Sequence, residues 1–161
     1  MKSQSQARAF SLVELVIVVV IIGVIAAIAV PRISRGARGA ADSALRGDLA
    51  ALRNSIDLYA AEHAGTFPAV LTIVDQLTIF TDDIGGTAAV KDATHIYGPY
   101  LRSIPTLPVA GEGATAGIRG DTTVAAAAAL GVAWVYSETT GEITANTGTA
   151  EDESGTKYID Y

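Results

Sequence analysis

The sequence predicts an α+β fold, in which one long N-terminal helix packs on a small antiparallel β-sheet. Three observations lead to this fold class. Residues 15–30 include no polar side chain, residues 45–63 carry an apolar stripe at helical spacing, and residues 132–146 have the pattern of two strands joined by a turn. A chain of 161 residues is long enough for one domain with an appendage.

The first element is an apolar helix over residues 10–30, which is interrupted only by Ser11 and Glu14. With a rise of about 1.5 Å per residue it is ~32 Å long, enough to cross the hydrocarbon core of a bilayer. Its many β-branched residues also suit a buried strand, but strands rarely exceed about 10 residues. The basic residues Lys2 and Arg8 predict a cytoplasmic N-terminus and a head outside the cytoplasm.

Two kinds of processing compete for this segment. A secretory signal peptide cut after Ala27-Ile28-Ala29 would release a soluble protein that begins at Val30. The alternative removes only residues 1–9 and keeps the apolar helix. Glu14 favours the second, because a carboxylate at a membrane centre costs about 2.5–3.5 kcal/mol and has no use in a disposable signal. The helical pattern also continues beyond the signal-peptide cleavage site.

The second part of the helix is an amphipathic stalk over residues 31–63. Its apolar residues follow one another at steps of three and four, which places them on one face of a helix, and Arg46 and Asp48 lie on the opposite face. Gly65 is expected at the C′ position that ends the helix, with Pro68 soon after. The apolar stripe consists of Leu45, Leu49, Leu52, Ile56, Tyr59 and His63.

We therefore expect one continuous helix over residues 10–63, with its weakest stretch between Gly23 and Pro31. Pro31 removes one backbone hydrogen bond and clashes with the carbonyl of Ala27, and Gly23 lowers the helix propensity. The stretch is expected to be straight or gently curved in the single chain.

The segment Ala9-Phe10-Ser11-Leu12-Val13-Glu14-Leu15 resembles the prepilin cleavage motif of type IV pilins and type II secretion pseudopilins. In that family a membrane peptidase cuts before the Phe and methylates the new amine, so the resemblance assigns cleavage and N-methylation to Ala9 and Phe10. The family's assembly glutamate and proline fall on Glu14 and Pro31. This chain has Ala9 where the family usually has Gly, and Ser11 where Thr is frequent.

Two head segments resemble the major pseudopilins more narrowly, residues 59–68 and 98–105. The chain has no cysteine, so it lacks the C-terminal cysteine pair of many type IV pilins. The resemblance implies a pilin fold divided into a leader peptide over 1–9, a transmembrane and assembly helix over 10–30, a stalk helix over 31–63 and a globular head over 64–161.

The resemblance also implies a function and a location. The chain is expected to be a structural subunit of a pseudopilus of a type II secretion system, held in the bacterial inner membrane by one span with its head outside the cytoplasm, and later part of a periplasmic or extracellular filament. The implied partners are identical subunits, the prepilin peptidase, other pilins or pseudopilins, the assembly platform and the lipid bilayer. The major pilin of a type IV pilus is the alternative within the family. A secreted or membrane-anchored binding domain is the alternative from another class.

Within the head, Trp134 lies with Val132 and Tyr136 on one face of the expected hairpin, and this face needs an apolar cover. The stripe residues Leu45, Leu49, Leu52, Ile56 and Tyr59 are expected to supply it. A self-associating coiled coil is the alternative for the stripe, although it has little more than two heptads. The expected head elements are a helix over 71–81, loops over 81–93 and 112–120, an unassigned segment over 124–130, a hairpin of 132–136 and 142–146, and an edge strand over 157–161.

The sequence carries no catalytic signature, and we expect no enzyme activity. It has no G-x-S-x-G, H-E-x-x-H or P-loop motif, and without cysteine it has no thiolate zinc site or thiol nucleophile. The net charge of -6 argues against nucleic-acid binding, which depends on neutralised phosphates. His63 is expected to pack in the core, and His95 to be a loop residue without a partner.

Calcium is the one candidate cofactor, because the heads of major pseudopilins often bind it near the C-terminus. Clustered carboxylates could supply part of the six to eight oxygens that calcium needs. Their spacing fits no ordered ligand loop, and a solvated acidic tail is the alternative. The candidate ligands are Glu151, Asp152, Glu153 and Asp160.

Overall fold

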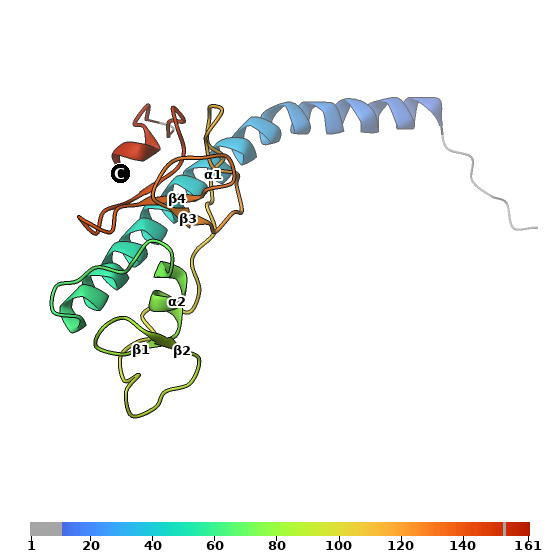
Figure 1. The fold of residues 1–161 in the computed structure, drawn as a ribbon. Helices are drawn as coiled ribbons and strands as arrows, with labels where there is room; N and C mark the ends of the chain where they lie inside the picture. The colour runs from blue at the N-terminus through green and yellow to red at the C-terminus, as the bar shows by residue number, and fades with distance from the viewer. Residues whose placement is uncertain (1–10, 153) are drawn as a thin grey trace, which may run out of the picture. The chain divides into compact units, whose positions relative to one another are not determined.

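The structure of the chain is a computed structural model that describes residues 11–152 and 154–161 (Figure 1). The predicted processing residues Ala9 and Phe10, and the candidate calcium ligand Glu153, lie outside the described residues. By its elements the chain is an α+β protein, with a long apolar N-terminal helix followed by a short helix and small sheets.

Helix α1 spans Leu12–Glu62 and has 51 residues. It belongs to both of the compact units into which the chain divides, residues 1–37 and 38–161. The backbone is helical throughout the expected weak stretch from Gly23 to Pro31.

The C-terminus of α1 is closed by a Schellman-type turn. The N–H of Gly65 donates to the carbonyl of Ala60 at 2.8 Å, and Ala64 adopts a left-handed φ of 55°. The residue at C′ is therefore Ala64, and the prediction of Gly65 at this position is wrong by one residue. Gly65 follows at C″ with a φ of 83°, which glycine adopts without steric cost.

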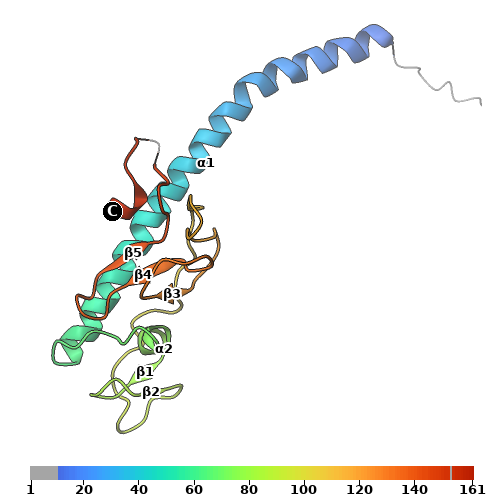
Figure 2. The same ribbon diagram turned by 45° about the horizontal axis from the view of Figure 1, so that its top comes forward.

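Two small sheets follow α1, and both views in Figures 1 and 2 show β4 and β5 along the part of α1 in the second unit. One sheet pairs β1 and β2 in antiparallel fashion, and the other has the order β3-β4-β5. The hairpin predicted over 132–146 is confirmed, with Val135 opposite Thr144, while β3 joins β4 in parallel. The strands are β1 (Phe80–Thr81), β2 (Thr87–Ala88), β3 (Val124–Ala125), β4 (Trp134–Tyr136) and β5 (Ile143–Ala145).

The region after α1 departs from the prediction of a helix over 71–81 and a loop over 81–93. Helix α2 covers only Ile73–Thr78, because the next residues become extended and enter β1. The expected loop contains β2, and it turns tightly because a carboxylate oxygen of Asp82 accepts the N–H groups of Ile84 and Gly86. The Asp82 side chain thus stabilises the turn between β1 and β2, and this short hairpin forms without an alternation of apolar and polar residues.

The predicted edge strand over 157–161 is wrong. Tyr158–Asp160 forms a 3₁₀ turn, η1, and only Lys157 makes a bridge, to Glu151. The hydroxyl of Tyr158 donates to the carboxylate of Asp42 on α1. This contact ties the segment to the helix.

One apolar core holds the second unit together. It combines the stripe of α1 with α2, the β4–β5 hairpin and the segment 104–109. Its largest fully buried side chains include Trp134, Tyr59, Tyr136, Leu45, Leu49, Leu52, Ile56, Ile73, Leu77, Leu107 and Ile143.

Candidate functional site

The apolar part of α1 is the first candidate site. The stretch Leu12–Val30 has 19 residues with a mean hydropathy of 3.2, and by length and composition it could cross a membrane. None of this span is buried within the chain, and exposures of its large apolar side chains range from 46% for Val18 to 77% for Leu12. This surface is available to a lipid bilayer or to other subunits.

Glu14 lies in the first turn of α1, where the helix dipole favours a negative charge. Its side chain is exposed, and it has no hydrogen bond or ion pair with any described residue. Pro31, the second predicted assembly residue, stands within the helical backbone. Glu14 is therefore open to a partner from outside this part of the chain.

The predicted stalk–head residues lie together in the core. Leu45, Leu49, Leu52, Ile56, Tyr59 and Trp134 are each at most 2% exposed. Two aromatic residues also make polar contacts at the edge of the core: the Trp134 indole N–H donates to the Pro105 carbonyl at 3.0 Å, and the Tyr136 hydroxyl donates to the Pro68 carbonyl at 2.9 Å. The sheet is thus held to the neighbouring segments by directional hydrogen bonds as well as by apolar contacts.

The two histidines take structural positions. His63 is buried and stacks on Tyr59 with 3.8 Å between ring centroids, and its ring nitrogens lie 2.8 Å from the carbonyl oxygens of Tyr59 and Asp82. His95 does have a partner, contrary to the prediction, since its Nδ1 lies 2.9 Å from a carboxylate oxygen of Asp92. The sequence alone did not indicate this pair, although a spacing of three residues permits it.

The three candidate calcium ligands that the structure describes do not form a metal-binding group. Glu151 and Asp160 are exposed, whereas the Asp152 side chain is 3% exposed and forms an ion pair with Arg46 at 3.0 Å. Among the described residues there is no group of three or more acidic or histidine side chains that could hold a metal ion. The sequence did not indicate that Arg46 and Tyr161 contact Asp152. Arg46 is 106 residues from Asp152 in the sequence, and Tyr161 is nine residues from it.

Asp48 is an unusual carboxylate on the stalk. It is half-buried, and none of the described residues pairs with it. Burial raises the pKa of its carboxyl above the ordinary value, because desolvation disfavours the charged form. Asp57 on the same helix is exposed and serves as its natural comparison.

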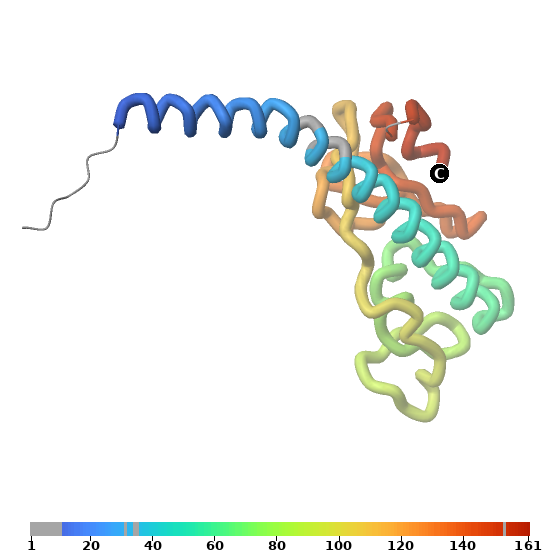
Figure 3. Tube along the Cα trace, turned by 180° about the vertical axis from the view of Figure 1, so that it is seen from behind, coloured from blue at the N-terminus to red at the C-terminus, as the bar shows by residue number. Residues whose placement is uncertain are grey.

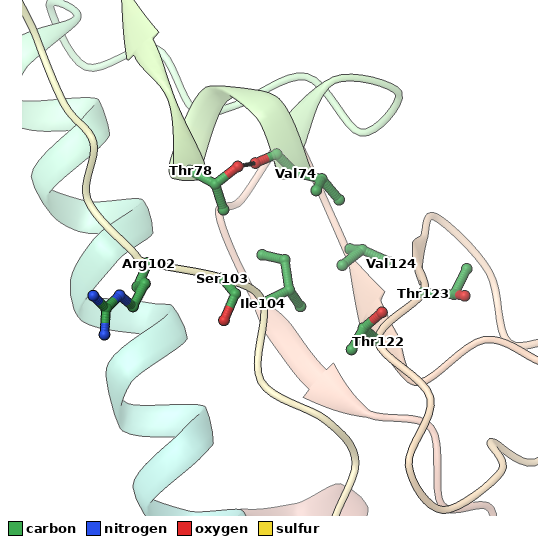
Figure 4. A pocket seen from close by; sticks show the side chains of 8 residues that line it. All are labelled: Val74, Thr78, Arg102, Ser103, Ile104, Thr122, Thr123 and Val124. Carbon is green, nitrogen blue, oxygen red and sulfur yellow. Dashed lines mark hydrogen bonds between the residues drawn. The ribbon is translucent and has the colours of Figure 1, made fainter. Parts of the chain in front are cut away.

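A surface hollow of about 430 Å³ lies between α2, the segment 102–104 and β3 (Figure 4). None of its described lining residues is an acid or a histidine. Its lining consists of Val74, Thr78, Arg102, Ser103, Ile104, Thr122, Thr123 and Val124.

Comparison with known proteins finds one family feature. Residues 4–30 match the prokaryotic N-terminal methylation motif, which covers the predicted cleavage site and the whole apolar stretch Leu12–Val30. No curated protein and no solved structure matches the chain. The motif and the apolar helix favour anchoring in a membrane, and the architecture is consistent with an α+β pilin fold. The motif indicates a type IV pilin-like subunit that is processed as a prepilin.

Proposed function

We propose that this chain is a structural, non-enzymatic subunit of a pseudopilus of a type II secretion system. The observation that carries the proposal is the methylation motif placed directly on an apolar helix whose one charged residue is Glu14. The absence of cysteine and the two pseudopilin-like head segments favour a pseudopilus over a type IV pilus. The subunit is held in the inner membrane with its head outside the cytoplasm, and then enters a periplasmic or extracellular filament.

Processing is the first step. A prepilin peptidase cleaves between Ala9 and Phe10 and methylates the new amine, which stays positively charged. The mature chain keeps the apolar helix as its membrane anchor. Intact-mass measurement of the membrane-extracted protein should give a methylated chain that starts at Phe10. A soluble chain starting at Val30 would overturn the proposal in favour of a secreted domain.

Assembly through Glu14 is the second step. In the single subunit, Glu14 is four residues after the Phe10 amine in the sequence and near the N-terminus of α1, where it partly neutralises the positive charge of that terminus. In a filament, neighbouring helices staggered by about one turn bring Glu14 beside the next subunit's amine. Either charge alone in an apolar bundle would be penalised by several kcal/mol, so the pair selects one axial register.

The Glu14→Ala variant tests this step. It should be cleaved and remain in the membrane as a stable monomer, yet form no filaments in sheared or crosslinked cells. Asp57→Ala removes an exposed carboxylate from the same helix and is the matched control, which should assemble normally. A normal filament yield for Glu14→Ala would show that the assigned role is wrong.

Packing should also loosen the helix around Pro31, because the proline lacks one backbone hydrogen bond. A cryo-electron microscopy map of the filament should show extended or irregular backbone between Gly23 and Pro31. Regular helix through the whole stretch would contradict this part of the proposal.

A further inference from the structure

Three side chains from distant parts of the sequence meet on α1, and we call them the C-terminal clasp: Arg46, Asp152 and Tyr161. One Arg46 guanidinium nitrogen donates to an Asp152 carboxylate oxygen at 3.0 Å and to the Tyr161 hydroxyl at 2.8 Å. The Tyr161 hydroxyl in turn donates to the same Asp152 oxygen, and the guanidinium lies 4.5 Å from the centre of the Tyr161 ring. Figure 3 shows the C-terminal segment beside this part of α1.

The carboxylate of Asp152 has no capacity left for a metal ion. Its second oxygen accepts the N–H of Ser154 at 2.8 Å, the hydroxyl of Ser154 at 2.7 Å and the N–H of Thr156 at 2.9 Å. Together with Arg46 and Tyr161 these donors number five, and a carboxylate offers about four lone-pair sites. These hydrogen bonds also hold the pKa of Asp152 well below its ordinary value.

The described residues around the clasp do not offer a second site for calcium. Calcium needs six to eight oxygen ligands, and the exposed carboxylates of Glu151 and Asp160 do not form a group with Asp152 among the described residues. The described donor set therefore does not fit calcium.

We infer that the guanidinium of Arg46 takes the place of a divalent cation and holds the C-terminal segment on α1 without calcium. Two further contacts serve the same end. Arg53 donates to the main-chain oxygen of Tyr161 at 2.6 Å, and the Tyr158 hydroxyl donates to Asp42. The C-terminal segment is thus joined to α1 at Asp42, Arg46 and Arg53, and the fold of the head does not depend on a metal.

Thermal unfolding of the full chain in detergent micelles tests this inference. The chain has one tryptophan, Trp134, which is fully buried in the core, so its fluorescence reports the unfolding of the head. The melting temperature should be the same in calcium chloride and in a calcium chelator. A higher melting temperature in calcium that disappears in Asp152→Asn would overturn the inference.

A double-mutant cycle of Arg46→Met and Asp152→Asn tests the clasp itself. Each single variant should melt several degrees below the native chain, and the double variant should lose less than the sum of the two single losses, because both single variants remove the Arg46–Asp152 contact. Strictly additive losses would overturn the inference. Arg38→Met is the matched control, since Arg38 is exposed on the same helix and pairs with no described residue.

If either single variant fails to fold, Tyr161→Phe keeps the ring and removes only the hydroxyl. Hydrogen exchange of the amides in residues 150–161 should then speed up while exchange in β4 and β5 stays unchanged. Unchanged exchange in the C-terminal segment would also count against the clasp.

Discussion

The two ends of helix α1 differ in what covers their apolar side chains. From Leu12 to Val30 none of the span is buried, whereas from Leu45 to Tyr59 the apolar stripe is almost completely buried by the head. Exposed apolar surface is unfavourable in water by about 25 cal/mol per Å². The first region therefore needs a cover from outside the described chain, and the second already has one.

The residue patterns agree with this difference. The first region is apolar on all sides, as expected for a helix surrounded by lipid or by other helices. The second is apolar on one stripe and carries Arg46 and Arg53 on its polar side, where both donate to the C-terminal residue. One helix thus exposes its apolar side chains over its first part and buries them in the core of the head over its last part.

The largest expected effect is a difference in head stability between two variants, in which a large apolar side chain is shortened to alanine in one region or in the other. Leu52→Ala leaves a cavity in the core and should lower the free energy of unfolding of the head by about 2–5 kcal/mol. Ile21→Ala, in the exposed stretch, should leave the unfolding of the head unchanged. Denaturant titration of both variants, followed by Trp134 fluorescence, makes the comparison. Equal losses in the two variants would mean that the two parts of α1 do not play separate roles.

A smaller effect is expected at the edge of the core. Tyr136→Phe removes the donor to the Pro68 carbonyl and leaves that buried oxygen without its partner, which should cost about 1–3 kcal/mol of head stability. Tyr97→Phe is the control, because the Tyr97 hydroxyl has no hydrogen bond within the described residues. Thermal unfolding should separate the two, and a larger loss in the Tyr97 variant would contradict the assignment.

The response to acid should also come from the head. Hydrogen bonds from Tyr161, Ser154 and Thr156 lower the pKa of Asp152 below its ordinary value of 3.8. A carboxyl with a lowered folded-state pKa stabilises the fold above the ordinary value, and this contribution is lost as the pH falls through the folded-state pKa. The difference in melting temperature between the native chain and Asp152→Asn should therefore be constant near neutral pH and shrink in strong acid. A difference that grows as the pH falls would contradict the clasp geometry.

The smallest effect is expected at Asp48. Burial raises the pKa of this unpaired carboxyl, so its charged form destabilises the folded state at neutral pH. Asp48→Asn should raise the stability of the head by about 0.5 kcal/mol, and Asp57→Asn, at an exposed position, should change nothing measurable. Differential scanning calorimetry of the two variants checks this. A loss of stability in Asp48→Asn would reveal a partner for this carboxylate.

The elements predicted correctly are those with a strong periodic signal. The apolar stripe from Leu45 to Tyr59 and the alternation around Trp134 each identify a buried face from local spacing alone. The strands β1 and β2 have only two residues each and no alternation, so their hairpin depended on a hydrogen-bonding pattern around Asp82 that composition does not reveal. The 3₁₀ turn at Tyr158 was likewise decided by a contact with Asp42, 116 residues away.

The sequence by itself determined the long helix, its division into an apolar and an amphipathic part, the processing motif and the pairing of the stripe with the β4–β5 hairpin. These features follow from periodicity and from a short linear motif, which are properties of neighbouring residues. Only the tertiary structure decided that Asp152 is bonded by Arg46 and Tyr161, and that Asp48 is half-buried without a partner among the residues that the structure describes. Such contacts depend on how segments distant in the sequence are placed in space. Neither the spacing nor the charge of the acidic C-terminal residues predicts that the Arg46 guanidinium lies beside Asp152.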